Sequence, residues 1–203
     1  ANDKMKDYLV SKNISDSKVF VTGIPISSRF LQTYNREEIL KEFDLKDNTK
    51  NILFFGGGEF GLGKARTVEI FNNLVKNFSD IQVIAIAGKN EKMKSEFEKI
   101  AEENNKQDCV KVLAFTNKVP ELMSISDLVI SKPGGLTTSE SLASNLPMII
   151  INPIPGQEEE NAEFLESKGT GIWLRKDDSS REVLKSVIDN PEKLNMMKKN
   201  TEI

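Results

Sequence analysis

The sequence predicts an α/β domain with a Rossmann-like, mostly parallel sheet of about six strands flanked by helices. From residue 50 onward, short apolar runs alternate with stretches whose apolar residues recur at helical spacing. The runs are almost continuously hydrophobic, which is typical of parallel strands buried on both faces. The expected strands are Ile52–Phe55, Val83–Ala87, Val110–Leu113, Leu128–Ile130, Met148–Ile151 and Ile172–Leu174. The expected helices are Lys64–Phe78, Glu91–Asn104, Pro120–Ser126, Thr137–Ser144, Glu159–Lys168, Ser180–Asp189 and Glu192–Asn200.

The residues before this pattern form a segment of a different kind. Asp3–Lys12 is expected to be a helix, Val19–Thr22 a strand and Gly23–Ser28 an extended connector. These three pieces are too small to bury a core by themselves. We therefore expect residues 1–30 to be the remnant of a preceding domain with an interdomain linker, and residues 31–203 to be the Rossmann-like domain.

Composition excludes several kinds of chemistry. The chain has no histidine, which excludes a Ser-His-Asp triad, an imidazole acid–base catalyst and a histidine-bound zinc. The single cysteine, Cys109, opens an apolar run and is interpreted as a small core residue. A net charge of −3 gives no reason to expect nucleic acid, since such a partner requires a basic surface. No apolar stretch approaches the roughly 20 residues of a membrane span.

A glycine-rich loop follows the first expected strand. It contains G-x-G-x-x-G at Gly56, Gly58 and Gly61, and such glycines let the backbone approach a phosphate group. A dinucleotide site would also need an acidic residue at the end of the second strand. Residues 88–90 read Gly-Lys-Asn at that place, so the sequence disfavours an NAD site.

A second loop, residues 131–140, reads Ser-Lys-Pro-Gly-Gly-Leu-Thr-Thr-Ser-Glu and leads into a helix. Unpaired N–H groups and the positive end of the helix dipole suit a diphosphate there, and Gly134 and Gly135 leave the approach open. Glu140, about one turn into the helix, can accept both hydroxyls of a ribose. The alternative is a capping box in which Glu140 accepts a bond from the Thr137 amide, and spacing alone favours this cap.

A third segment, residues 153–162, reads Pro-Ile-Pro-Gly-Gln-Glu-Glu-Glu-Asn-Ala and also begins a helix. Gln157 and Glu158, nearest the loop, are the candidates for a ligand rich in hydroxyls, because planar amide and carboxylate groups form paired hydrogen bonds. Glu159 and Glu160 suit the positive end of the helix dipole.

Together these segments resemble the C-terminal domain of family 28 glycosyltransferases, which have the two-domain GT-B fold. The motifs are Gly-Gly-Gly-Glu-x-x-Gly, Ser-Lys-Pro-Gly-Gly-Leu-Thr-x-Ser-Glu and Pro-Gly-Gln-Glu-x-x-Asn. The nearest subgroup is the diacylglycerol glycosyltransferases, namely bacterial processive glucosyltransferases and plant monogalactosyldiacylglycerol synthases. The peptidoglycan N-acetylglucosaminyltransferase is a more distant relative. Residues 21–26 also resemble the interdomain junction of the family, so the likeness covers essentially the whole chain.

The resemblance implies a uridine diphosphate (UDP) sugar as the donor substrate. The positions that bind this donor in the family correspond to Gly57, Gly58, Phe115, Thr116, Gly134, Gly135, Leu136, Thr137, Glu140, Gln157, Glu158 and Asn161. Phe115 and Thr116 would border the uracil, the helix start at residues 134–137 would hold the diphosphate, and Glu140 would hold the ribose in preference to capping. The third segment would contact the sugar. Many relatives carry a basic residue near the diphosphate where this chain has Ser27, and Arg29 could take its place.

The implied reaction is transfer of a hexose from a UDP-sugar to a diacylglycerol-type lipid. The acceptor site and the catalytic base would belong to the missing N-terminal domain, so this chain is expected to bind donor but to be inactive alone. No cofactor is expected, and without an Asp-x-Asp triplet no metal ligand set is evident. The protein would be cytoplasmic, with peripheral contact at the inner face of the membrane made only through the missing domain.

Three other functions remain open at this level. They are the N-acetylglucosamine transfer of peptidoglycan synthesis, nucleotide-sugar epimerisation, and nucleotide sensing by a non-catalytic module.

Overall fold

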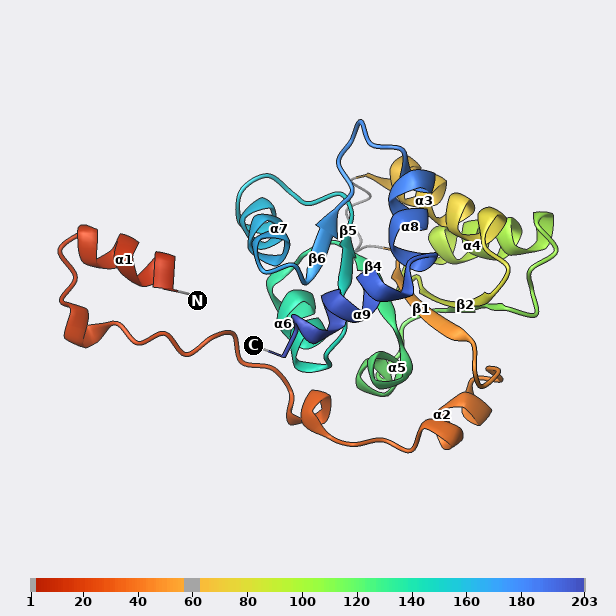
Figure 1. The fold of residues 1–203 in the computed structure, drawn as a ribbon, viewed down its shortest axis with the longest axis horizontal. Coiled ribbons are helices and arrows are strands. Elements are labelled where there is room, and N and C mark those ends of the chain that lie inside the picture. Colours follow the sequence, from red (N-terminus) through yellow and green to blue (C-terminus); the bar gives the residue numbers. More distant parts are fainter. Residues whose placement is uncertain (1–2, 57–62, 203) are drawn as a thin grey trace.

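The computed structural model describes residues 3–56 and 63–202, which form a doubly wound α/β body with an N-terminal arm projecting from it (Figure 1). The sheet has six strands in the order β3-β2-β1-β4-β5-β6, and every neighbouring pair is parallel. The strands are β1 Lys50–Phe55, β2 Ile81–Ile86, β3 Val110–Leu113, β4 Leu128–Ser131, β5 Met148–Ile150 and β6 Gly171–Trp173. The predicted fold class is confirmed.

Helices cover both faces of this sheet. The α-helices are α1 Asp3–Ser11, α2 Arg36–Glu42, α3 Lys64–Asn77, α4 Glu91–Glu103, α5 Val119–Ile125, α6 Gly135–Ala143, α7 Gln157–Ser167, α8 Ser180–Ile188 and α9 Pro191–Lys199. Two short 3₁₀ helices, η1 Asp16–Lys18 and η2 Ser28–Leu31, lie before α2. None of the described helices combines the length and the apolarity needed to cross a membrane.

The alternation of side chains along each strand produces two cores. In β1, Ile52 and Phe54 face α3, α4, α8 and α9, whereas Leu53 faces α2, α5 and α7. On the first face the rings of Phe54, Phe71 and Phe97 pack together, with centroids 4.1 to 5.5 Å apart. Because both faces are buried, the strands carry the continuous apolar runs from which they were predicted.

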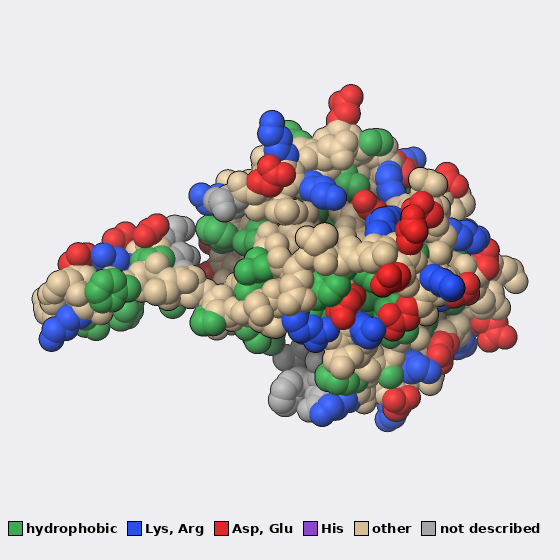
Figure 2. Space-filling model, turned by 90° about the horizontal axis from the view of Figure 1, so that it is seen from below, with side chains coloured by type: hydrophobic (Ala, Val, Ile, Leu, Met, Phe, Trp, Pro, Cys, Tyr) green, Lys and Arg blue, Asp and Glu red, His purple; other side chains and the backbone are tan. Residues whose placement is uncertain are grey.

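The prediction of a strand at Val19–Thr22 was wrong. This segment is extended but forms no ladder, and Phe20 is 78% exposed. A strand is stabilised by its neighbours, and this segment lies on an arm that projects from the body (Figures 1 and 2). The division of the chain at residue 30 stays a prediction. Sequence periodicity also missed η2 and α2, which have four and seven residues and are too short to show a repeat.

A buried polar cluster fixes the start of the sheet. The side-chain amide of Asn51 donates from Nδ2 to the Ile125 carbonyl at 3.0 Å, and its Oδ1 accepts from Gln82 Nε2 at 2.9 Å. Gln82 Nε2 also donates to the Lys46 carbonyl at 2.8 Å, and its Oε1 accepts from the Lys46 amide at 2.6 Å. Gln82 therefore anchors the loop that precedes β1.

We expect Gln82→Met to lower the free energy of unfolding by about 2–4 kcal/mol, because it leaves the Lys46 backbone and the Asn51 amide oxygen buried without partners. Urea denaturation followed by circular dichroism measures this change. The same substitution at the exposed Gln107 is the control and should change stability by less than about 0.5 kcal/mol. Equal effects at the two positions would contradict this assignment.

Candidate functional site

The order of the strands reverses between β1 and β4, which are hydrogen-bonded neighbours in the middle of the sheet. The chain leaves β1 for α3 on one face and leaves β4 for α6 on the other. Loops that depart to opposite faces open a crevice between them, and ligands of open α/β sheets bind at such switch points. Both glycine-rich loops predicted from the sequence begin at this place.

The first backbone amides of α6 have no acceptor among the residues that the structure describes. Gly134 is the N-cap residue with φ −60° and ψ 147°, and no side chain caps the helix. The first intrahelical bond runs from the Thr138 amide to the Gly134 carbonyl at 2.8 Å. The amides of Gly135, Leu136 and Thr137 precede that bond, so the helix supplies no acceptor for them. With the helix dipole they form a seat suited to an anion.

The capping alternative for Glu140 was wrong. It required a helix beginning after Thr137, but α6 begins at Gly135, which places Thr137 within the first turn. Among residues 3–56 and 63–202, nothing forms a hydrogen bond or ion pair with the half-buried Glu140 carboxylate. Burial raises the pKa of Glu140 above its ordinary value. A carboxylate held partly buried without a partner is available to a ligand.

The start of α7 lies directly against the start of α6. Asn161 Nδ2 donates to the Pro133 carbonyl at 2.8 Å and thereby ties α7 to the turn that precedes α6. Glu158 Oε2 accepts from the Ile154 amide at 2.8 Å, which braces the loop between β5 and α7. A Cβ atom on Gly134 would lie 3.9 Å from Glu158 Oε1. The structure therefore brings the second and third predicted segments together.

Close approach explains the glycine at position 135. A Cβ atom there would lie 3.1 Å from Ile24 Cδ1 and 3.8 Å from Gln157 Nε2. Ile24 comes from the connector that precedes η2, so the connector and α7 both pack on the first residue of α6. Leu136, next along the helix, is 59% exposed.

Other predicted positions lie farther away. Phe115 is 69% exposed and Thr116 accepts a bond from the Lys118 amide at 3.1 Å, both just beyond β3. Three strand spacings separate β3 from β4, or roughly 14 Å across the sheet. Arg29 is bound by both oxygens of Glu121, at 2.8 and 2.9 Å, so a diphosphate contact would require it to leave that pair. Gly57 and Gly58 lie outside the described residues.

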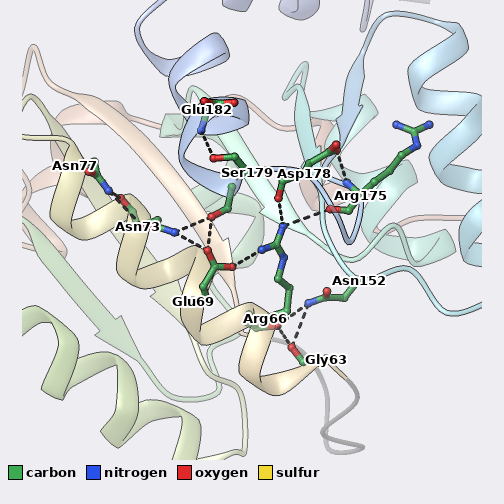
Figure 3. A network of polar contacts seen from close by, with 12 residues as sticks. Gly63, Arg66, Glu69, Asn73, Asn77, Asn152, Arg175, Asp178, Ser179 and Glu182 are labelled. Atoms are coloured by element: carbon green, nitrogen blue, oxygen red, sulfur yellow. Dashed lines mark hydrogen bonds and ion pairs between the residues drawn. The ribbon is translucent and has the colours of Figure 1, made fainter.

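Sequence reasoning missed Asn152, which joins the two sides of the crevice. It follows β5 with a positive φ of 46°, a conformation in which Asn is enriched among residues other than glycine. Its Nδ2 donates to Thr67 Oγ1 at 2.9 Å and to the Gly63 carbonyl at 3.3 Å (Figure 3). Asn152 thus connects the loop before α7 to the first turn of α3. An Asn directly before Pro153 was the available signal.

No group of three His, Cys, Asp or Glu side chains among the described residues is arranged to hold a metal ion. The arrangement instead offers backbone amides for an anion, with carboxylate and amide side chains beside them for hydroxyl groups.

Fold and site define a Rossmann-like domain of the GT-B type. The fold matches that of the UDP-GlcNAc 2-epimerase from Neisseria meningitidis bound to UDP-GlcNAc, with a TM-score of 0.73, 19% identity and coverage of 97% of this chain and 53% of that one. It also matches WaaG, a glycosyltransferase involved in lipopolysaccharide biosynthesis, with a TM-score of 0.67, 21% identity and coverage of 88% and 49%.

A family model described as "Glycosyl transferases group 1" matches residues 35–203, and the chain belongs to this family. It is 35% identical over 200 residues to the processive diacylglycerol beta-glucosyltransferase of Bacillus subtilis (strain 168), which covers 98% of this chain and 51% of that protein. It is also 35% identical over 197 residues to the enzyme of the same name from Staphylococcus epidermidis (strain ATCC 12228 / FDA PCI 1200), and the match covers 97% of this chain and 49% of that protein. The chain spans about half the length of these curated relatives, and the resemblance inferred from the motifs is confirmed.

Stability should depend on pH through Glu140. Burial raises the pKa of Glu140 in the folded protein above its pKa in the unfolded chain. The contribution of Glu140 to stability is therefore complete below the unfolded-state pKa and is lost as pH rises through the folded-state pKa. The glutamine of Glu140→Gln cannot ionise. The melting temperature of this variant minus that of the parent should therefore be larger at about pH 7.5 than at about pH 4.

Thermal denaturation at both pH values measures this difference. The control is Glu102→Gln at an exposed position of α4, for which the difference should stay nearly constant. A melting temperature of Glu140→Gln that falls relative to the parent at the higher pH would show that the carboxylate is stabilising and not available.

Proposed function

We propose that the chain is the donor-binding half of a glycosyltransferase that moves a hexose from a UDP-sugar to the hydroxyl of a diacylglycerol-type lipid. The observation that carries the proposal is the start of α6, which has no side-chain cap, together with the Glu140 carboxylate, which has no partner among residues 3–56 and 63–202. Family membership and the relatives' names support it. The acceptor site and the catalytic base would be supplied by a further domain at the inner face of the membrane.

The start of α6 suits the chemistry of this transfer. As the bond between the sugar and the diphosphate breaks, negative charge accumulates on the departing phosphate oxygens. The amides of residues 135–137 and the helix dipole are already oriented before the reaction, so they can stabilise this charge without a reorganisation cost. No step in this scheme calls on a side chain of this half as acid or base.

The remaining parts of the donor would then lie on either side of the diphosphate. Glu140 would accept the ribose hydroxyls, and Phe115 and Thr116 would border the uracil about 14 Å along the sheet edge. An extended nucleoside diphosphate can bridge that separation. On the opposite side, Gln157 and Glu158 would contact the hexose, with Asn161 holding their helix against the Pro133 turn.

Epimerisation of a nucleotide sugar is the second candidate, since a 2-epimerase bound to UDP-GlcNAc has the same fold. Sequence favours transfer: the glucosyltransferase of Bacillus subtilis is 35% identical to this chain, whereas the epimerase is 19% identical. The crystal structure of MurG from Acinetobacter baumannii has the same fold, with 18% sequence identity to this chain and a TM-score of 0.61. Analysing the products that the intact parent forms from UDP-glucose, with and without diacylglycerol, separates a transferase from an epimerase and from a nucleotide sensor.

Isothermal titration calorimetry with UDP tests the donor site. We expect the chain to bind UDP, and we expect Glu140→Gln to weaken binding by about tenfold or more, because hydrogen bonds to the ionised carboxylate are lost. Binding of 2′-deoxy-UDP should be weaker than that of UDP in the parent and should respond less to the substitution, since one partner hydroxyl is already absent.

This comparison forms a double-mutant cycle between the protein and the ligand. An equal loss of affinity for UDP and for 2′-deoxy-UDP would place Glu140 away from the ribose 2′-hydroxyl. Absence of binding at millimolar UDP would overturn the donor-site proposal.

A further inference from the structure

The segment between β5 and α7, residues 151–156, leads directly to the proposed hexose contacts at positions 157 and 158. Pro153 and Pro155 each fix one φ angle of this segment. Two carboxylates of the first turn of α7 also reach back to it. Glu158 Oε2 accepts from the Ile154 amide at 2.8 Å, and Glu159 Oε2 accepts from the Gly156 amide at 3.2 Å. A segment stiffened in this way keeps its shape, so its points of attachment decide where the hexose contacts lie.

The segment and the helix that follows it are attached on both sides of the crevice. Toward α6, Asn161 Nδ2 donates to the Pro133 carbonyl at 2.8 Å. Toward α3, Asn152 Nδ2 donates to Thr67 Oγ1 at 2.9 Å and to the Gly63 carbonyl at 3.3 Å (Figure 3). The first attachment belongs to the turn that precedes the diphosphate seat. The second sets the distance between the segment and α3.

Packing at the α3 attachment leaves no room for adjustment. A Cβ atom on Gly63 would lie 2.8 Å from Asn152 Cγ and 2.9 Å from its Nδ2. Gly63 also has a φ of 78°, which glycine adopts without steric cost. Thr67, the second partner of Asn152, is 3% exposed. The side chain of Asn152 is therefore in contact with the backbone of α3 and fixes the separation of the two chain segments.

The first turns of α3 are themselves held from another direction. Arg66 donates to the Asp178 carbonyl at 2.6 Å and pairs with Glu69 at 2.7 Å (Figure 3). One turn further along, Asn73 Nδ2 donates to Ser180 Oγ at 2.7 Å. These bonds connect α3 to the start of α8 and to the loop before it. The helix is thus a fixed reference for the segment between β5 and α7.

We propose that Asn152 is a positioning residue for the hexose of the donor. By holding the segment at a fixed distance from α3, it places Gln157 and Glu158 against the hexose, while Asn161 independently holds the side next to the diphosphate. The inference rests on the proposed function, because it takes the hexose contacts from that function. Its consequence is that the preference for a UDP-sugar over UDP depends on a bond that the donor does not touch.

Asn152→Gly removes the attachment and still permits the positive φ of this position, so it tests the side chain and not the backbone conformation. The measurement is isothermal titration calorimetry with UDP and with UDP-glucose, and the melting temperature verifies that each variant is folded. We expect the dissociation constant of UDP-glucose to rise about fivefold or more, because misplaced contacts bind poorly. That of UDP should change by less than about twofold.

Thr67→Val distinguishes positioning from direct contact. The buried Thr67 cannot reach a ligand, and valine keeps its shape while removing the hydroxyl that accepts from Asn152. We expect a smaller loss of UDP-glucose affinity in the same direction, because the bond to the Gly63 carbonyl remains. The double variant should lose no more affinity than Asn152→Gly alone, since both changes remove the same attachment.

Asn105→Gly is the matched control. Asn105 is exposed, has a φ of 53° and lies between α4 and β3, at the opposite edge of the sheet from the crevice. Both dissociation constants should be those of the parent.

The outcomes separate this inference from the donor site on which it rests. Equal weakening of UDP and UDP-glucose by Asn152→Gly, or an unchanged affinity for UDP-glucose, would overturn the positioning role and leave the donor site in place. A loss in Asn152→Gly that Thr67→Val does not share would indicate that Asn152 touches the sugar itself, and would also overturn the positioning role. A parent chain that binds neither ligand would overturn the proposed function.

Discussion

The requirement that a parallel sheet be buried on both faces determines where this protein can bind anything. The helices must be divided between the two faces, and the chain must return from the β3 edge to place β4 beside β1. At that return the helices that follow β1 and β4 lie on opposite faces, and the carboxyl ends of the two strands are left without a crossover helix above them. Every proposed contact with the donor diphosphate and ribose follows from this single reversal.

The crevice contains features that are locally unfavourable and that the surrounding fold maintains. Within the part of the chain that the structure describes, the start of α6 has no side-chain cap, and Glu140 is partly buried without a partner. The turn before α6 is held by contacts from elsewhere: Asn161 binds the Pro133 carbonyl, and Ile24 lies against Gly135. Such sites are expected where a protein binds a ligand, because the ligand supplies the missing partners.

The loop between β5 and α7 organises two neighbouring regions at once. Asn152 binds it to the first turn of α3, and Glu158 and Glu159 each accept from a backbone amide within the loop. The loop and α7 also meet the start of α6, because Asn161 binds the Pro133 carbonyl and Glu158 lies near Gly134.

From residue 50 onward, the sequence alone determined the order of strands and helices, and it identified the family, because continuous apolar runs and short motifs are local properties of the chain. Tertiary structure decided the rest. Only the folded structure showed that α6 begins at Gly135, with Gly134 as its N-cap residue, which excluded the expected cap for Glu140. The pairing of Arg29 with Glu121 joins residues 92 positions apart. No local pattern encodes such a contact, because it depends on which surfaces of the folded chain meet.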